Sequence, residues 1–265
     1  MDLMEALPVR EHLTGEVAPL LARLAAEEAS GVLSREGGAL HLVRGRVAYA
    51  ESVSAPGPDA LLLAHGTLDG DVWKKTVSRR GAVQLLVDEG HLPRGAVELC
   101  LLGALFDAAY FALSPGDTPA RFRYDDTQDE PGVVRPVEAG ALERETARRR
   151  ALLDRVWPDG RTDDAPLRLV DPHPPPRLPA RRRAVLDQVD GDRTATDIAH
   201  RLGRRAFPTL LDVRRLAAAG LVTPLVTPNP PPAASTSPVP APGPLPDDDP
   251  HITLLKRLRD ALEAL

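Results

Sequence analysis

Apolar positions between residues 13 and 125 follow a helical spacing, then a strand spacing, then a helical spacing again. Apolar residues three or four positions apart predict an amphipathic helix from Gly15 to Ala29. Residues 31–52 alternate apolar and polar side chains around glycine-containing turns, and this pattern predicts three antiparallel strands. The strand positions expected to share one buried face are Leu40, Leu42, Val47 and Tyr49.

Helical spacing returns after the Pro-Gly-Pro break at residues 56–58. Glycines divide the following segment into predicted helices at residues 59–65, 71–80, 82–89 and 95–113. Residues 120–124, ARFRY, alternate again and predict a closing strand. Residues 13–125 are therefore expected to form one α+β domain.

Residues 179–223 predict three short helices with clear start and stop signals. Thr194 and Asp197 form a capping-box pair at the start of the second helix, so the first N–H groups of that helix have acceptors. The third helix accepts Pro208 in its first turn and ends at Gly220, before a short strand. This order of elements predicts a small winged-helix-like domain.

The segment between the two predicted domains begins with a helix at residues 141–157, which is expected to bridge them. Arg148 to Arg150 are expected to remain in solvent. The positions of this helix that can dock on a neighbour are Leu142, Thr146, Leu152, Leu153 and Val156. Residues 158–178 follow as a Pro-rich linker, which is expected to be extended and semi-rigid.

The C-terminal part of the chain has a different composition. Residues 224–249 are rich in Pro, Ala, Ser and Thr, and they are predicted to be disordered because they hold too little apolar surface to fold. Residues 250–265 then predict a short amphipathic helix, which on a long tether is typical of a motif that docks in a partner's groove. Folding back onto its own domain is the alternative. The docking candidates are Ile252, Leu255, Leu258, Leu262 and Leu265.

Two stretches of the N-terminal domain carry a resemblance to a known family. Residues 13–52 place glycines and apolar residues in a helix, strand, hairpin and strand pattern, at Gly31, Leu33, Gly45, Val47 and Ala50. Residues 85–113 and 120–126 follow as helices and a last strand. These motifs resemble the PATAN domain of bacterial signalling proteins. The resemblance implies regulatory and protein-interaction roles in two-component and small-GTPase-linked systems, and it implies no enzyme activity.

Residues 179–223 resemble two kinds of winged helix through the run Asp190-Gly191, Arg193-Thr194 and Asp197-Ile198-Ala199. The first kind occurs in bacterial transcriptional regulators, where the third helix enters the major groove of DNA. The second kind holds peptides. The DNA-contact candidates are Arg204, Arg205, Thr209, Arg214 and Arg215, with Arg181, Arg182 and Arg183 as further phosphate contacts.

Two features of this region argue against DNA binding. Asp212 stands in the middle of the presumed recognition helix, where its charge repels phosphate. The prolines from Pro224 onward leave almost no room for a return strand, so the wing is incomplete.

Composition narrows the class of protein further. A net charge of −5 argues against a globally basic nucleic-acid-binding protein, although residues 179–223 hold nine Arg against five Asp. The single cysteine, Cys100, excludes an intramolecular disulfide, and no signal peptide is visible, so a cytoplasmic location is expected. The longest apolar stretch, Leu99 to Leu113, contains Asp107 and is expected to be too short to cross a membrane.

Searching the sequence for chemistry gives no catalytic, cofactor or metal site. The seven histidines lie at no metal-ligand spacing to one another or to the cysteine, and no phosphate-loop, nucleophile-elbow or His-Glu-x-x-His motif occurs. A cluster of carboxylates at residues 125–130 is expected to be a solvated loop. Two hypotheses follow. The first, which the sequence favours, is a transcriptional regulator in which the PATAN-like domain controls a DNA-binding winged helix. The alternative is an adaptor of a bacterial small-GTPase or two-component signalling complex, in which the winged helix binds protein.

Overall fold

The computed structural model describes residues 12–64, 66–76, 82–116, 118–124, 135–170 and 177–225, which fold as a mixed α+β protein. The helices are α1 (Val17–Ala26), α2 (Pro58–Ala64), α3 (Gly70–Thr76), α4 (Ala82–Asp88), α5 (Arg94–Ala112), α6 (Ala139–Val156), α7 (Arg161–Asp164), α8 (Ala180–Leu186), α9 (Ala195–Arg201) and α10 (Ala206–Ala218). The carboxylate cluster at residues 125–130, the segment 226–249 and the docking helix predicted at 250–265 lie outside the described residues.

The main sheet is antiparallel, with strands in the order β1-β5-β2-β3-β4-β6. Its strands are β1 (His12–Gly15), β2 (Gly31–Arg35), β3 (Gly38–Val43), β4 (Arg46–Glu51), β5 (Ala120–Tyr124) and β6 (Val137–Glu138). The three strands predicted in residues 31–52 and the closing strand at 120–124 are confirmed. Strands β1 and β6 were not predicted, and they extend the sheet at its two edges.

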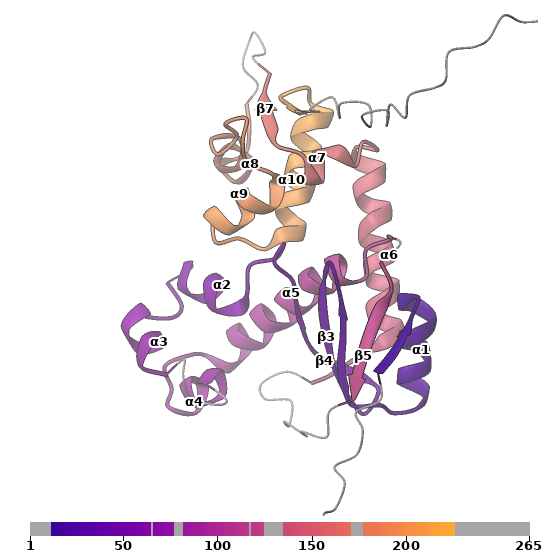
Figure 1. Cartoon of the computed structure of the whole chain (residues 1–265). Helices are drawn as coiled ribbons and strands as arrows, with labels where there is room; N and C mark the ends of the chain where they lie inside the picture. Colours follow the sequence, from indigo (N-terminus) through magenta and orange to yellow (C-terminus); the bar gives the residue numbers. More distant parts are fainter. Residues whose placement is uncertain are drawn as a thin grey trace, which may run out of the picture. The chain divides into compact units, whose positions relative to one another are not determined.

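Helices α1, α5 and α6 cover one face of this sheet (Figure 1). Their apolar residues form a single core with the inward-facing strand residues, at whose centre Leu21, Leu24 and Phe122 are fully buried. Burial of each such side chain stabilises the folded state by roughly 1.5–3 kcal/mol. The amphipathic helix predicted from Gly15 is therefore confirmed, although it begins at Val17 because Gly15 belongs to β1.

The prediction that Tyr49 faces this core is wrong. A β-bulge shifts the pairing between β3 and β4, so that His41 lies opposite Tyr49 and the next residue of β3, Leu42, lies opposite Val47. The extra residue turns the following side chains over. Ala50 therefore enters the core in place of Tyr49, whose side chain lies on the other face and is 41 % exposed.

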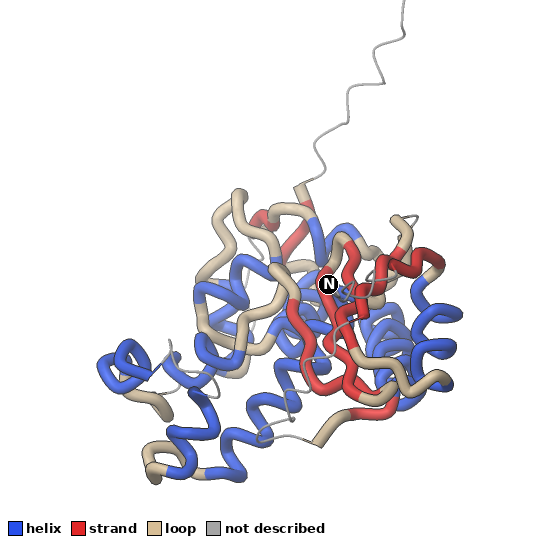
Figure 2. Tube along the Cα trace, turned by 60° about the horizontal axis from the view of Figure 1, so that its bottom comes forward, coloured by secondary structure: helices blue, strands red, loops and turns tan. Residues whose placement is uncertain are grey.

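Helices α2, α3 and α4 form an arm with a small core of its own. That core also takes residues from the first half of α5, and its buried members are Leu62, Leu68, Leu86, Leu92 and Val97. Figure 2 shows these helices on one side of the strands. Helix α5 is long and apolar enough to cross a membrane by length and composition, contrary to the expectation from sequence, and half of that stretch is buried inside the fold.

The C-terminal helices confirm the capping signals read from the sequence. The Thr194 side chain accepts the N–H of Asp197, and the Asp197 side chain accepts the N–H of Thr194, so the capping box of α9 is complete. Helices α8, α9 and α10 build one apolar core around Ile198, Leu210 and Leu216. This core is shared with α6 and with residues of α5.

The predicted linker at residues 158–178 contains regular structure. It holds α7 and the strand β7 (Leu167–Leu169), which pairs with β8 (Val222–Pro224) in a two-stranded antiparallel sheet. The strand after α10, β8, therefore pairs with a strand that precedes the three helices in the chain. The prolines after β8 do not prevent this pairing, because no strand after Pro224 takes part in it. Leu167 is fully buried, so this part of the segment belongs to the folded unit.

Candidate functional site

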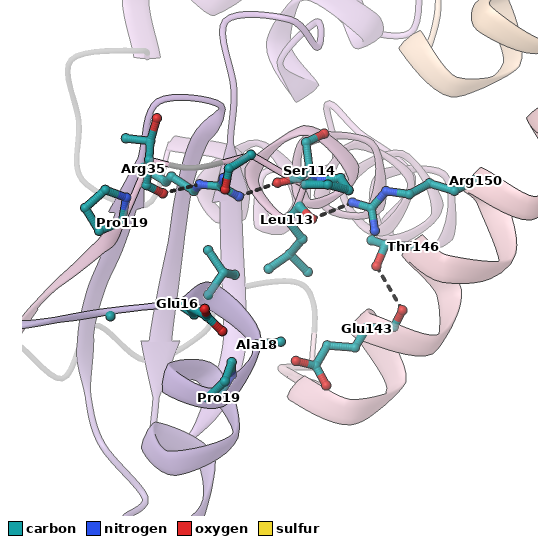
Figure 3. Close-up of a pocket in the computed structure, with 15 residues that line it drawn as sticks. Glu16, Ala18, Pro19, Arg35, Leu113, Ser114, Pro119, Glu143, Thr146 and Arg150 are labelled. Carbon is teal, nitrogen blue, oxygen red and sulfur yellow. Dashed lines mark hydrogen bonds between the residues drawn. The ribbon is translucent and has the colours of Figure 1, made fainter. Parts of the chain in front are cut away.

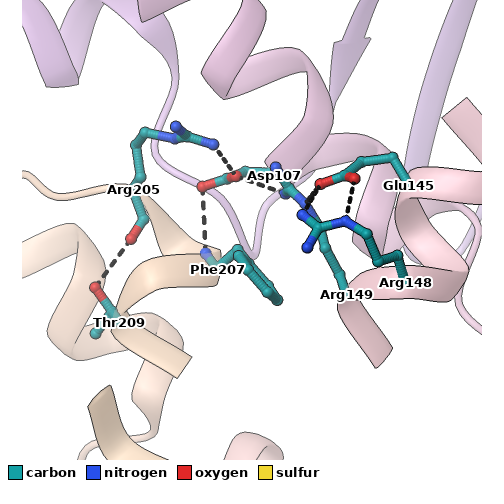
Figure 4. A network of polar contacts seen from close by, with 7 residues as sticks. All are labelled: Asp107, Glu145, Arg148, Arg149, Arg205, Phe207 and Thr209. Carbon is teal, nitrogen blue, oxygen red and sulfur yellow. Dashed lines mark hydrogen bonds and ion pairs between the residues drawn. The ribbon is translucent and has the colours of Figure 1, made fainter. Parts of the chain in front are cut away.

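A buried carboxylate marks the place where the sheet-covering helices meet the three C-terminal helices. Asp107 lies in the apolar helix α5, and its side chain is only 2 % exposed. Its Oδ1 accepts hydrogen bonds from Nη1 of Arg149 and Nη2 of Arg205, each at 2.8 Å, and its Oδ2 accepts the backbone N–H of Phe207 at 3.2 Å. One carboxylate thus joins α5, α6 and the first turn of α10 (Figure 4).

The charge of Asp107 is well compensated for a buried group. Two guanidinium groups and the N-terminal end of α10 surround it, and a helix N-terminus favours negative charge. The Arg149 guanidinium also stacks over the Phe207 ring, 4.6 Å from its centroid, and over the Phe106 ring at 5.5 Å. A buried ion pair of this kind favours one arrangement of the helices, because removing either partner leaves the remaining buried charge less well compensated.

These contacts correct the expectation that Arg148 to Arg150 remain in solvent. Arg149 is buried, and Arg150 donates to the carbonyl oxygens of Tyr110 and Leu113 at the end of α5. Arg148 remains exposed and pairs with Glu145, which also accepts a hydrogen bond from Arg149. The arginines of α6 therefore attach that helix to α5.

Glu145 makes this network sensitive to acid. Hydrogen bonds from Arg148, and then from Arg149, lower the pKa of Glu145 from 4.5 to about 2, although burial acts in the opposite direction. Because the folded chain favours the carboxylate, the stabilisation is fully present above about pH 4.5 and is lost as the pH falls toward 2. We therefore expect Glu145→Gln to remove part of the decrease in Tm that the wild-type chain shows between pH 5 and 2.

The control for this measurement is Glu98→Gln, which removes a half-exposed carboxylate on α5 outside the network. Tm measured against pH should differ from wild type in shape for Glu145→Gln and only by a constant offset for the control. Parallel curves for wild type and Glu145→Gln would show that the ion pairs of Glu145 contribute nothing to acid stability.

Helix α10, the presumed recognition helix, is buried along most of its length. Arg214 binds both oxygens of Asp163 at 2.7 Å and also donates to the carbonyl oxygen of Trp157. Thr209 donates to the carbonyl oxygen of Arg205 at 2.9 Å and is 1 % exposed. Thr209 and Arg214 therefore cannot contact DNA in this fold, which corrects the expectation from sequence for both residues.

The remaining DNA-contact candidates are arginines near α10, and several of them are bound to other groups of the protein. Arg205 forms an ion pair with Asp107. Arg181 forms an ion pair with the buried Asp212 at 2.7 Å, so the charge of Asp212 is compensated within the protein. Arg204 donates to the carbonyl oxygen of Arg181. The candidates that are exposed or partly exposed on α8 and on the outer side of α10 are Arg181, Arg182, Arg183 and Arg215, of which Arg181 and Arg215 lie beside Asp212.

A second feature is a cavity of about 720 Å³ between the start of α1, the loop from α5 to β5, and α6 (Figure 3). Both arginines that line the cavity donate hydrogen bonds to backbone carbonyl oxygens. Arg35 donates to the carbonyl oxygens of Ser114, Gly116 and Thr118, and Arg150 binds the end of α5 as described above. Burial raises the pKa of Glu143, whose Oε1 has no hydrogen-bond partner. The polar groups of the cavity mainly hold the α5–β5 loop in place.

No group of three or more His, Cys, Asp or Glu side chains within the part of the chain that the structure describes is arranged to hold a metal ion. The residues that organise the molecule are instead Asp107, Arg149 and Arg214. The sequence offered one signal for them, which is the single acidic residue inside the apolar run of α5.

The chain was compared with protein-family models, with curated proteins and with solved structures. No family model, no curated protein and no solved structure matches it.

Proposed function

We propose that this chain is a non-enzymatic adaptor of the cytoplasm that binds other proteins, and that its three C-terminal helices serve this purpose and do not read DNA. The observation that carries the proposal is the burial of α10. A DNA-reading helix must leave one side free to enter a groove about 12 Å wide. The accessible positions of α10 form one narrow stripe, which consists of Pro208, Leu211, Arg215 and Ala218.

This stripe is poorly suited to DNA. It offers a single arginine, and that arginine lies 3.7 Å from the carboxylate of Asp212. The N-terminal end of α10, which a DNA reader points toward the bases, donates instead to Asp107. Opening the helix to DNA would remove the N–H of Phe207 and the guanidinium of Arg205 from the buried Asp107, which would keep only Arg149 as a partner.

Several features of the chain support the protein-binding role. Val53, Leu99, Leu169 and Val170 are exposed apolar side chains that a protein partner can cover. The amphipathic pattern of residues 250–265 is typical of a docking helix. The PATAN-like pattern implies a place in a bacterial small-GTPase or two-component signalling complex.

Binding to DNA distinguishes this proposal from the transcriptional-regulator hypothesis. We expect the full chain to show no saturable binding to a labelled 30-base-pair duplex of mixed sequence at 50 mM salt, measured by fluorescence anisotropy. A protein that neutralises several phosphates would bind there and lose roughly a thousandfold in affinity by 200 mM salt. Such salt-dependent binding, if Arg182→Glu with Arg183→Glu abolished it and Lys74→Glu with Lys75→Glu did not, would establish the regulator instead.

Capture of a partner tests the adaptor role directly. We expect replacement of Leu255, Leu258 and Leu262 by Ser to abolish cross-linked capture of a specific protein by the full chain. Replacement of Lys256 and Arg259 by Ser is the matched control, because it changes the same segment and spares its apolar stripe. Equal recovery of the same partner with both variants would contradict a docking role for this segment.

A further inference from the structure

The face of the main sheet opposite α1, α5 and α6 carries an ordered row of side chains. The strand pairing places Arg123 of β5 opposite Val32 of β2, Val32 opposite His41 of β3, and His41 opposite Tyr49 of β4. Arg123 and Tyr49, at the two ends, are exposed. Because neighbouring strands lie about 4.8 Å apart, the row is about 14 Å long. We call these four residues the sheet row.

The two ends of the sheet row differ in charge. At the β5 end, Arg121 and Arg123 are both exposed, and neither has an ion-pair partner among the residues that the structure describes. At the β4 end, Glu51 is exposed beside Tyr49. Partial burial, and then the charges of Glu51 and Asp59, raise the pKa of Tyr49. The outer face is therefore basic at β5. Its β4 end carries the carboxylate of Glu51, 3.4 Å from Nε2 of His41, and the exposed ion pair of Arg46 with Glu138.

This polarity selects the kind of partner. A nucleic-acid strand is anionic along its whole length, so the carboxylates at the β4 end would repel it. Single-stranded nucleic acid also binds through successive aromatic platforms, and Tyr49 is the only exposed aromatic side chain among the described residues of this face. A protein segment that carries both an acidic and a basic residue can pair with the arginines at β5 and with Glu51 at β4. Tyr and Arg are also the residues most enriched at the energetic centres of protein interfaces.

We propose that the outer face of the sheet binds an extended protein segment of mixed charge, with a carboxylate opposite Arg121 and Arg123 and a basic side chain beside Tyr49 and Glu51. An extended chain advances about 3.3 Å per residue, so the acidic and basic residues of the ligand stand roughly four positions apart. The basic side chain can stack on the Tyr49 ring as a cation–π pair. This inference rests on the proposed adaptor function and names one of its binding surfaces.

The test is selection of a phage-displayed random 12-residue peptide library on the full chain. We expect the enriched peptides to share an acidic residue about four positions from a basic residue. Their binding should weaken roughly tenfold or more with Arg121→Glu and Arg123→Glu combined, and also with Tyr49→Ala. Lys74→Glu with Lys75→Glu makes the same charge change on exposed positions of α3 and should leave binding unchanged.

Charge reversal in the peptide provides a second, independent readout. A peptide whose acidic residue is replaced by Lys should bind the Arg121→Glu, Arg123→Glu chain better than the wild-type chain. Enriched peptides that bind wild type and this variant equally would overturn the sheet-face proposal and leave the adaptor function standing. An enriched set without the charge pattern would overturn it too. Binding of a mixed-sequence single-stranded 20-mer that requires Arg121 and Arg123 would replace it with a nucleic-acid site.

Discussion

Replacing Asp107 by Ala is expected to lower the free energy of unfolding by about 3–5 kcal/mol, among the largest effects of any single substitution in this chain. The change removes the acceptor of Arg149, Arg205 and the N–H of Phe207 at once. Arg149 is 6 % exposed at its side chain, so it cannot turn outward to water without moving α6 or α10. Its charge would then be balanced by Glu145 alone, whose side chain is partly exposed.

Thermal unfolding measures this effect directly. For a folded unit of this size, each kcal/mol corresponds to about 2–4 °C, so Asp107→Ala should lower Tm by about 6–20 °C. Asp107→Asn keeps an acceptor for Phe207 but loses the charge, and it should fall between wild type and Ala. Asp71→Ala removes a carboxylate that is 82 % exposed and should change Tm by little. If Asp107→Ala matched Asp71→Ala, the helices would be held together by apolar packing alone.

Replacing Gly31 by Ala is expected to destabilise the fold by about 3–5 kcal/mol, for a steric reason. Gly31 begins β2 with φ of 151°, a conformation that side-chain-bearing residues rarely adopt. A Cβ atom there would lie 2.2 Å from the carbonyl oxygen of Arg123 and 2.8 Å from Cζ of Phe122. The backbone of β5 would have to separate from β2, in the centre of the sheet.

Gly15→Ala is the matched control for this substitution, since a Cβ at Gly15 meets no atom within 4 Å. Both glycines lie in strands of the main sheet, so both replacements alter strand propensity similarly. Urea or guanidinium unfolding of the two variants should therefore separate steric conflict from propensity. A Gly31→Ala chain as stable as Gly15→Ala would show that β2 and β5 are farther apart in solution than in this structure.

The elements that sequence reasoning found are those whose signals are local. The turn at Arg44 and Gly45, where both residues have positive φ, requires only its own residues and the strands beside it. The capping box of Thr194 and Asp197 spans four positions and is complete in the structure. These elements can be predicted from sequence because the residues that form them are neighbours in the chain.

The elements that sequence reasoning missed depend on distant partners. Strand β6 has two residues, too few to show any alternation, and it exists only because β4 lies beside it. The buried arginines pose the same difficulty. Arg149 binds a carboxylate 42 positions away, and Arg214 binds one 51 positions away. In a chain this rich in arginine, nothing local separates those two from the arginines on the surface.

The pairing of β7 with β8 has a consequence for how this protein can be divided. The sequence suggests that the three C-terminal helices form an independent domain beginning at residue 179. A fragment that begins there would lack Leu167 and Asp163. Leu167 fills the base of their core, and Asp163 neutralises Arg214 in its interior. A fusion or domain swap that moves these helices into another protein would therefore have to include α7 and β7 as well.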